Sequence, residues 1–239
     1  MARPLGSRPV NAPARPRALV TGASRGVGAA VAAALATTYD VLLGGRDVAA
    51  LEQAAARLPG SRPWPVELTD PDALTSATSG IDRLAVLVHC AGTVELGSVA
   101  KTPAAVWRQQ MEVNLVAVAE LTRLLLPALR TARGHVVLIN SGAGLRANPG
   151  WGAYAASKFA LRAFGDVLRA EEPDLRVTSV HPGRIDTPMQ RAVRAAEGGD
   201  YEPERYLHPD SVAGAVLAAV TAPPDAHLTD VVLRPDGRR

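Results

Sequence analysis

The amino-acid sequence predicts one doubly wound α/β domain, in which helices cover both faces of a parallel sheet of about seven strands. Short apolar runs alternate along the chain with longer helical patterns. Several of these runs are apolar at every position, as expected for strands that are buried on both faces. A glycine-rich turn also joins the first run to the first helical pattern. The length of 239 residues suits a single domain of this kind.

The expected elements follow one another in a regular order. The strands are Ala18–Val20, Val41–Leu43, Trp64–Leu68, Leu84–Val88, His135–Ile139, Val177–Val180 and Val231–Leu233. The helices between them are Val27–Ala36, Ala49–Leu58, Asp72–Ser79, Val106–Leu129, Tyr154–Glu171 and Ser211–Val220. Such alternation favours right-handed crossovers between parallel strands.

Local residue types support several of these boundaries. Asp47 and Asp70 stand where helix N-caps are expected, and Pro71 occupies a first helical position. Pro173 ends the long helix that begins near Tyr154. Gly165 lies inside that helix, where it costs stability, so we expect it to permit close packing.

Composition excludes several classes of function. The net charge is only +3, and no basic stripe with interleaved aromatic residues indicates nucleic-acid binding. No apolar run is long enough to span a membrane. Cys90 is the single cysteine, which excludes an internal disulfide and a cysteine-based zinc site, and no other metal site is expected. Residues 1–16 lack the pattern of a secretory signal and are expected to form a poorly ordered extension of a cytoplasmic protein, with the domain spanning 17–239.

The segment after the first strand reads Thr-Gly-Ala-Ser-Arg-Gly-Val-Gly and runs directly into a helix. Glycines there let phosphate oxygens approach the main chain, and the free N–H groups of the helix can hold a pyrophosphate. This context predicts a Rossmann-type nucleotide site, although a purely structural turn is the alternative. The residues expected to bind are Gly22, Ser24, Arg25, Gly26, Val27 and Gly28.

The end of the second strand predicts which dinucleotide binds. NAD-specific sites usually carry a carboxylate there for the adenosine ribose, but this strand ends in Gly-Gly-Arg46. Arg46 and Arg25 can instead clamp a 2′-phosphate through charge-assisted hydrogen bonds. NADP(H) is therefore the expected cofactor, ahead of NAD(H). The alternative is two solvated arginines in an arginine-rich chain.

Three polar residues form a candidate catalytic group. Ser141 follows the strand His135–Ile139, and polar residues at that end of a central strand face the ligand crevice. Tyr154 and Lys158 have an i,i+4 spacing that places them on one helical face. A phenol can supply the proton when a ketone is reduced, and a nearby ammonium brings its pKa down towards the working range. The alternative is that Tyr154 packs and Lys158 is a surface charge.

Taken together, the sequence from about Arg17 to Leu233 resembles the short-chain dehydrogenases/reductases. The motifs that carry the resemblance are Gly22, Gly26 and Gly28 in the loop, Ala91-Gly92, Asn114, Ser141, Tyr154 with Lys158, and Pro182-Gly183 with Thr187. His89 departs from the family, which has asparagine there, and we expect this to alter a strand contact.

The resemblance implies a role for each of these residues. Tyr154 would be the acid/base, Lys158 would hold the nicotinamide ribose, and Ser141 would orient the carbonyl. Asn114 would bind a water in a proton relay. The expected cofactor contacts outside the loop are Arg46, Glu67 and Leu68 near the adenosine, and Ala91, Gly92, Pro182, Gly183 and Thr187 near the nicotinamide. The family also implies a homodimer or homotetramer built on the two long helices.

The expected function is reversible hydride transfer between NADP(H) and a small carbonyl or alcohol substrate. A non-catalytic NADP(H) sensor on the same fold is the first alternative. A Rossmann-like methyltransferase is the second, although it would not explain Tyr154 and Lys158. Trp151 is expected either to line the substrate pocket beside Ser141 or to anchor a loop. We expect His135 to face solvent.

Overall fold

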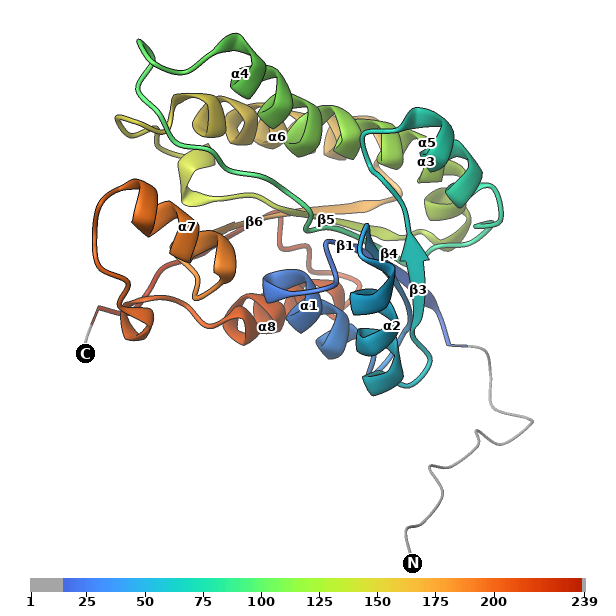
Figure 1. Ribbon diagram of the computed structural model, residues 1–239. Helices are drawn as coiled ribbons and strands as arrows, with labels where there is room; N and C mark the ends of the chain where they lie inside the picture. Colours follow the sequence, from blue (N-terminus) through green and yellow to red (C-terminus); the bar gives the residue numbers. More distant parts are fainter. Residues whose placement is uncertain (1–14, 238–239) are drawn as a thin grey trace, which may run out of the picture.

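The computed structural model describes residues 15–237, and its centre is a seven-stranded parallel sheet in the order β3-β2-β1-β4-β5-β6-β7 (Figure 1). The predicted fold class is confirmed. Of the expected extension, residues 1–14 lie outside the described part of the chain. The strands are β1 (Arg17–Thr21), β2 (Asp40–Gly45), β3 (Arg62–Pro65), β4 (Val86–His89), β5 (His135–Ile139), β6 (Arg176–Pro182) and β7 (Asp230–Leu233).

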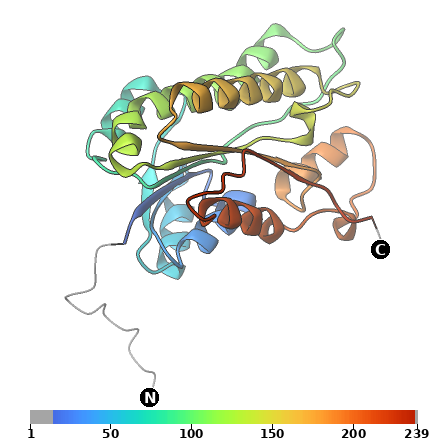
Figure 2. The same ribbon diagram turned by 180° about the vertical axis from the view of Figure 1, so that it is seen from behind.

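Helices cover both faces of this sheet, as the two opposite views show (Figures 1 and 2). One layer contains α1 (Gly26–Leu35), α2 (Val48–Arg57) and α8 (Pro209–Val220). The other contains α3 (Pro71–Thr78), α4 (Ala104–Met111), α5 (Ala117–Ala132) and α6 (Gly152–Glu171). A further helix, α7 (Pro188–Ala196), lies beyond the end of β6.

Two hydrophobic cores lie on the two faces of the sheet. Successive residues of a strand point to opposite faces, so Ala18 and Val20 enter the core under α1 and α8, while Leu19 enters the core under α5 and α6. All three are fully buried. The continuous apolar runs of the sequence therefore reflect burial on both sides, as predicted.

The predicted helix signals act as expected. Asp47 accepts a hydrogen bond from Ala50 N, and Asp70 accepts from two backbone N–H groups of α3. Gly165 lies so close to β5 and β6 that an added Cβ would be 2.9 Å from Leu138 Cδ1 and 3.0 Å from Ser179 Oγ.

The third strand begins and ends earlier than the predicted Trp64–Leu68. It spans Arg62–Pro65 at the edge of the sheet and contains two prolines. Val66 N donates to Gly45 O of β2 at 2.9 Å. Successive residues of a strand direct their backbone N–H groups to opposite sides, so the nitrogens of Pro63 and Pro65 face away from β2, on the open edge of the sheet. An edge strand tolerates proline there because those nitrogens have no ladder partner to lose.

Two helical predictions need correction. The expected helix Val106–Leu129 is a continuous helical run, but it contains a π-helical segment at Glu112–Val116 that separates α4 from α5. Helix α7 was not predicted, because it is short and buries only Gln190 and Val193. Thr187 caps it by accepting from Gln190 N at 3.2 Å.

The prediction that His135 faces solvent is wrong, because the residue is only 4% exposed. The segment after α8 covers it, and the His135 and His227 rings meet edge to face with centroids 5.9 Å apart. In the described part of the chain, no helix is both long and apolar enough to cross a membrane.

Candidate active site

The candidate site lies at the carboxyl ends of β1, β4, β5 and β6, where the loops after these strands meet. The chain winds away from β1 in opposite directions, towards β2 on one side and β4 on the other, so this is the switch point of the sheet. Thr21 joins the two central strands there, since its Oγ1 accepts from Cys90 N at 3.0 Å and from Ala91 N at 3.1 Å.

The glycine loop has the backbone geometry that its sequence predicted. Gly22 and Gly26 have φ values of +68° and +57°, in the left-handed region that favours glycine. An added Cβ on Gly28 would be 2.1 Å from Gly22 O, so only glycine fits at that contact. An added Cβ on Gly22 would be 3.0 Å from Ala91 N. The loop therefore brings β1 close to the segment after β4.

The amino end of α1 is open to a ligand. Arg25 is the N-cap residue in extended conformation, and no side chain caps the helix. Its first N–H groups are thus available for an anion, as at phosphate sites. Across the crevice, Thr187 Cγ2 would be 3.4 Å from a Cβ on Gly26. The structure thereby brings together the loops after β1 and β6. Ser24 and Val27 are half-buried in the same loop.

The two arginines expected at a 2′-phosphate are both exposed, but one has a partner. Arg46 lies 3.4 Å from Glu67 Oε2, with its side chain 78% exposed. The pKa of Glu67 lies below its ordinary value. Burial raises it, but the hydrogen bonds from Thr69 and the charge of Arg46 together lower it by more, so the carboxylate is ionised. The sequence predicted that Arg46 would bind the 2′-phosphate and Glu67 the adenine, whereas in the structure the two side chains pair with each other. Leu68 follows, half-buried.

Lys158 is buried, and its Nζ donates to Ile139 O at 3.0 Å at the end of β5. Burial lowers the pKa of Lys158 to about 8. Asn114 reaches the same place from the other side: a Cβ on Gly92 would be 3.1 Å from Asn114 Oδ1 and 3.9 Å from Lys158 Nζ. Gly92 therefore leaves space between the two polar side chains.

The π segment explains how Asn114 reaches this point. The extra residue in the turn directs its side chain inward, where Nδ2 donates to Thr93 O at 3.0 Å and to Ser157 Oγ at 2.9 Å. Its Oδ1 accepts from Thr93 N at 2.9 Å. Ser157 Oγ in turn donates to Tyr154 O at 2.8 Å. The Asn114 amide thus fastens the segment after β4 to the start of α6.

Tyr154 and Ser141 meet through their hydroxyls. Burial raises the pKa of the Tyr154 phenol, and its hydrogen bond with Ser141 lowers it by less. Lys158 Nζ lies 5.9 Å from the Tyr154 ring centroid. The sequence predicted that the ammonium would bring the phenol's pKa down, whereas in this structure burial dominates and the net direction is upward. A phenol with this pKa is protonated at neutral pH and able to donate.

Sequence reasoning missed two buried residues behind Ser141. Asn140 accepts from Ser141 N at 2.8 Å and donates to Lys158 O at 3.1 Å, so it joins the end of β5 to α6. His181 Nδ1 lies 3.4 Å from Ser141 O, and Nε2 lies 3.1 Å from Asp230 Oδ1. Both neighbours of His181, a backbone carbonyl and a carboxylate, are acceptors. The sole sequence signal for either residue was a polar side chain at a strand end.

A pocket of about 340 Å³ lies between the loops after β4 and β5 and the end of α7. Trp151 lines it, and its ring meets the Tyr154 ring with centroids 5.8 Å apart. Trp151 also forms a β-bridge with Gly97. Both expected roles of Trp151, pocket wall and loop anchor, are compatible with this position.

The side of the pocket formed by α7 carries an ionic cluster. Glu197 lines the pocket and accepts from Arg184 and from Arg194, each at 2.8 Å. These hydrogen bonds hold the pKa of Glu197 below its ordinary value. Arg184 also lies over the Trp151 ring, 5.9 Å from its centroid. The cluster ties α7 to the segment after β6.

The remaining motif residues lie at the rim or away from it. Gly183 N donates to Leu233 O at 2.8 Å, which ties the segment Pro182-Gly183 to β7. His89 faces the core, where its Nε2 lies 2.9 Å from Thr122 Oγ1, and burial lowers its pKa to about 3. His89 thus joins β4 to α5 through this contact. Burial also raises the pKa of Cys90 to about 12, which leaves an unreactive thiol.

Comparison with known proteins shows the family to which the chain belongs. Residues 16–198 match the family model described as short chain dehydrogenase. An uncharacterized oxidoreductase of Schizosaccharomyces pombe is 32% identical over 192 residues, covering 76% of this chain and 78% of that protein. The glycine betaine reductase of Emericella nidulans is 34% identical over 234 residues and 91% of this chain. The chain spans only 18% of that reductase's length, and 62% of the bovine dehydrogenase/reductase SDR family member 7B.

Solved structures agree. An alcohol dehydrogenase from Thermococcus sibiricus, complexed with 5-hydroxy-NADP, superposes with a TM-score of 0.85 at 27% identity, covering 94% of this chain and 98% of that one. A metagenomic short-chain oxidoreductase in complex with NADP gives 0.79 at 29% identity, covering 93% and 97%. Fold, site geometry and the match to more than half of the sequence lead to one conclusion: this chain belongs to the short-chain dehydrogenase family of oxidoreductases.

Proposed function

We propose that this chain catalyses reversible hydride transfer between NADP(H) and a carbonyl or alcohol substrate, with Tyr154 as the acid/base. One observation carries the proposal. A protonated phenol, a serine hydroxyl bonded to it and a buried ammonium converge at the carboxyl end of the sheet, and the Trp151 ring that meets the phenol ring lines a pocket. A purely structural Tyr154 would not need the Ser141 hydroxyl, from the segment after β5, and the Lys158 ammonium of its own helix around it.

The residues at the switch point fit a nicotinamide dinucleotide. The left-handed glycines and the uncapped α1 suit its pyrophosphate, and the close approach of Gly22 to Ala91 leaves no room for side chains there. When bound, the nicotinamide ring supplies or accepts the hydride. The adenosine end would meet Arg25, Arg46, Glu67 and Leu68. The nicotinamide end would meet Ala91, Gly92, Pro182, Gly183, Thr187 and Lys158.

The preference for NADP(H) rests on charge. No carboxylate ends β2, and the exposed Arg25 and Arg46 stand on the two loops that border the adenosine. The Arg46–Glu67 pair is exposed and worth little, so a 2′-phosphate can compete for the guanidinium. The two solved relatives described above hold NADP or its 5-hydroxy derivative, which points the same way.

The protein's own groups would handle the proton. Tyr154 donates its phenolic proton to the oxygen on which negative charge develops during carbonyl reduction, and takes it back during alcohol oxidation. Ser141 hydrogen bonds to the same oxygen and orients it. The Lys158 ammonium lowers the cost of forming the phenolate once the substrate shields the site from water. Asn114, with its amide occupied, would support the relay through its backbone.

Tyr154→Phe tests the assignment. It should lower kcat for carbonyl reduction by about 10³-fold, because the proton donor is lost, while leaving NADPH binding within about twofold. Steady-state rates over a carbonyl panel and fluorescence titration with NADPH measure the two quantities. Tyr39→Phe, at the other end of the sheet, is the matched control. Tight NADPH binding without turnover on any carbonyl or alcohol would instead favour a sensor.

A second experiment tests the cofactor. Arg46→Ala and Arg25→Ala should each raise the KM for NADPH by about tenfold and leave the KM for NADH nearly unchanged, since only NADPH carries the 2′-phosphate. Arg57→Ala, on the exposed last turn of α2, is the control. Equal effects on both cofactors would refute the phosphate clamp.

A further inference from the structure

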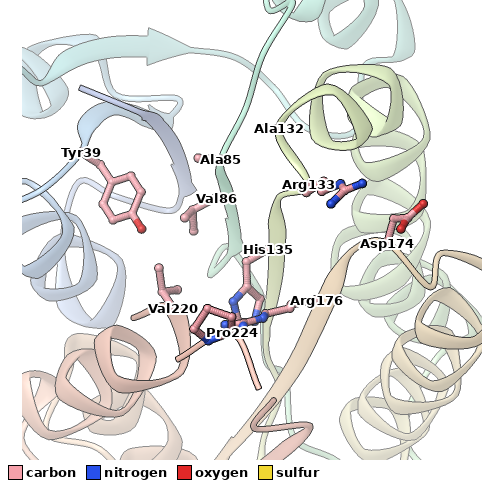
Figure 3. A pocket seen from close by; sticks show the side chains of 10 residues that line it. All are labelled: Tyr39, Ala85, Val86, Ala132, Arg133, His135, Asp174, Arg176, Val220 and Pro224. Carbon is pink, nitrogen blue, oxygen red and sulfur yellow. The ribbon is translucent and has the colours of Figure 1, made fainter. Parts of the chain in front are cut away.

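A second pocket lies at the opposite end of the sheet from the candidate active site. It encloses about 470 Å³ at the amino ends of β4, β5 and β6 (Figure 3). His135 and Arg176 are the first residues of β5 and β6, Tyr39 directly precedes β2, and Arg133 follows α5. These polar side chains come from separate segments, and none of them takes part in the reaction proposed above.

His135 supplies a buried acceptor to this pocket. Thr178 Oγ1 has one proton, which it donates to Leu228 O, so it must accept from His135 Nε2, 2.8 Å away. Burial lowers the pKa of His135 to about 3, so the ring is neutral. Nδ1 then carries a lone pair. It has no hydrogen-bond partner in the described part of the chain, although the residue is only 4% exposed.

An unpartnered buried acceptor is costly, and a ligand that brings a donor to it would remove the cost. Water can also fill such a position, so the acceptor by itself does not identify a ligand. The charged groups that line the pocket indicate which kind of ligand fits it.

The pocket carries an excess of positive charge. Neither Arg133 nor Arg176 forms an ion pair with any residue that the structure describes. Arg176 is held in place by Ala222 O and Pro223 O, both at 2.9 Å. Asp174 is the one acid among the lining residues, and in Figure 3 its carboxylate and the Arg133 guanidinium both point away from His135. Two guanidinium groups against one carboxylate leave a formal charge of +1, which favours an anion.

Arg133 also has an unusual backbone. Within residues 15–237 it is the one non-glycine residue with positive φ, at 47°. Glycine is the usual residue at such a helix end, and an arginine there costs stability. The order Arg133-Gly134 cannot be reversed, because a Cβ at position 134 would be 2.7 Å from Leu84 O. Strain kept at one charged residue, on the rim of a pocket, indicates a function for its side chain.

From these observations we infer that this pocket binds a small organic anion that also carries a hydrogen-bond donor, such as a hydroxycarboxylate. The acid group meets Arg176, the donor meets His135 Nδ1, Arg133 adds positive charge at the rim, and the carbon skeleton lies on the apolar residues Val86, Ala132 and Val220. This site is independent of the proposed hydride-transfer reaction.

Three probes of one skeleton separate these contributions: L-lactate, propionate, which lacks the hydroxyl, and L-lactamide, which lacks the charge. Each is titrated into the full chain with ¹⁵N-labelled histidine, and NMR follows the His135 ring nitrogens. His135→Gln identifies its signals among the five histidines. L-Lactate should shift Nδ1 and bind about tenfold more tightly than either analogue.

Arg133→Gly separates binding from folding. Glycine adopts the left-handed conformation freely, so this variant should melt at a higher temperature than the wild type while losing lactate affinity about tenfold. Arg57→Ala should change neither. Equal binding of lactate and propionate, the absence of any His135 response, or unchanged affinity in Arg133→Gly would each overturn the inference.

Discussion

The Lys158 ammonium is buried among α6, β5 and the segment after β4, where one backbone carbonyl is the acceptor for its Nζ. Burial lowers its pKa from 10.5 to about 8. In the unfolded chain the ammonium keeps its proton up to the ordinary value. Between these two pH values the unfolded state therefore binds more protons, and the free energy of unfolding rises with pH.

Lys158→Met tests this linkage. The wild type should gain roughly 2 kcal/mol of stability between about pH 8 and about pH 10 relative to Lys158→Met, because only the wild type releases the proton on folding there. Urea unfolding at a series of pH values measures the difference, and other titrating groups cancel in it. Parallel curves for the two proteins would show that the ammonium is solvated.

At the residue scale, sequence patterns predicted the groups that come together but not how they are held. The i,i+4 spacing placed Tyr154 and Lys158 on one helical face. The pKa of the phenol came out in the opposite direction from the prediction, because its burial depends on Trp151 and on the loops around it. The Arg46–Glu67 pair joins residues that are far apart in the sequence, so no local pattern indicated it.

At the element scale, the long helical run shows what periodicity leaves out. Its apolar pattern predicted one helix, and the run is continuous, but a π segment surrounds Asn114. The bulge is stabilised by hydrogen bonds to Thr93 and Ser157, which belong to other segments. Helix α7 was missed for a related reason, since it is short and is held in part by ion pairs of Glu197 with Arg184 and Arg194, which no periodicity shows.

Two glycines inside helices give a matched test of packing. Gly165→Ala in α6 should destabilise the protein by about 1–3 kcal/mol, because the new Cβ would press on Leu138 and Ser179. Gly214→Ala in α8 meets nothing within 4 Å and should stabilise it by about 0.5–1 kcal/mol through helix propensity. Thermal or urea unfolding compares them. The same sign for both changes would contradict the packing argument.

At the scale of the whole molecule, an apolar stripe on α6 suggests how copies associate. Phe159 and Val167 are 41% and 52% exposed, and the exposed Ala163 lies between them at i,i+4 spacing. Such a stripe on a surface helix is typical of an interface. It agrees with the homodimer or homotetramer expected from the two long helices.

The double variant Phe159→Glu/Val167→Glu should therefore shift the protein towards monomer, because two carboxylates would be buried in the contact. Sedimentation velocity measures the change in mass. Val48→Glu, equally exposed but in the opposite helical layer, should leave the oligomer intact. A wild-type protein that sediments as a monomer would contradict the prediction that copies associate through α6.

The sequence by itself determined the order of strands and helices, the doubly wound parallel sheet and the positions of the glycine loop, Ser141, Tyr154 and Lys158. These features depend on periodicity, turn chemistry and fixed spacing, which are local properties of the chain. Only the tertiary structure decided the depth of burial, the ionic partners of Arg46 and Glu197, and the placing of His135 beside Thr178 and of His181 between Ser141 and Asp230. Burial and pairing arise where segments far apart in sequence meet, so their effects on charge can be seen only after folding.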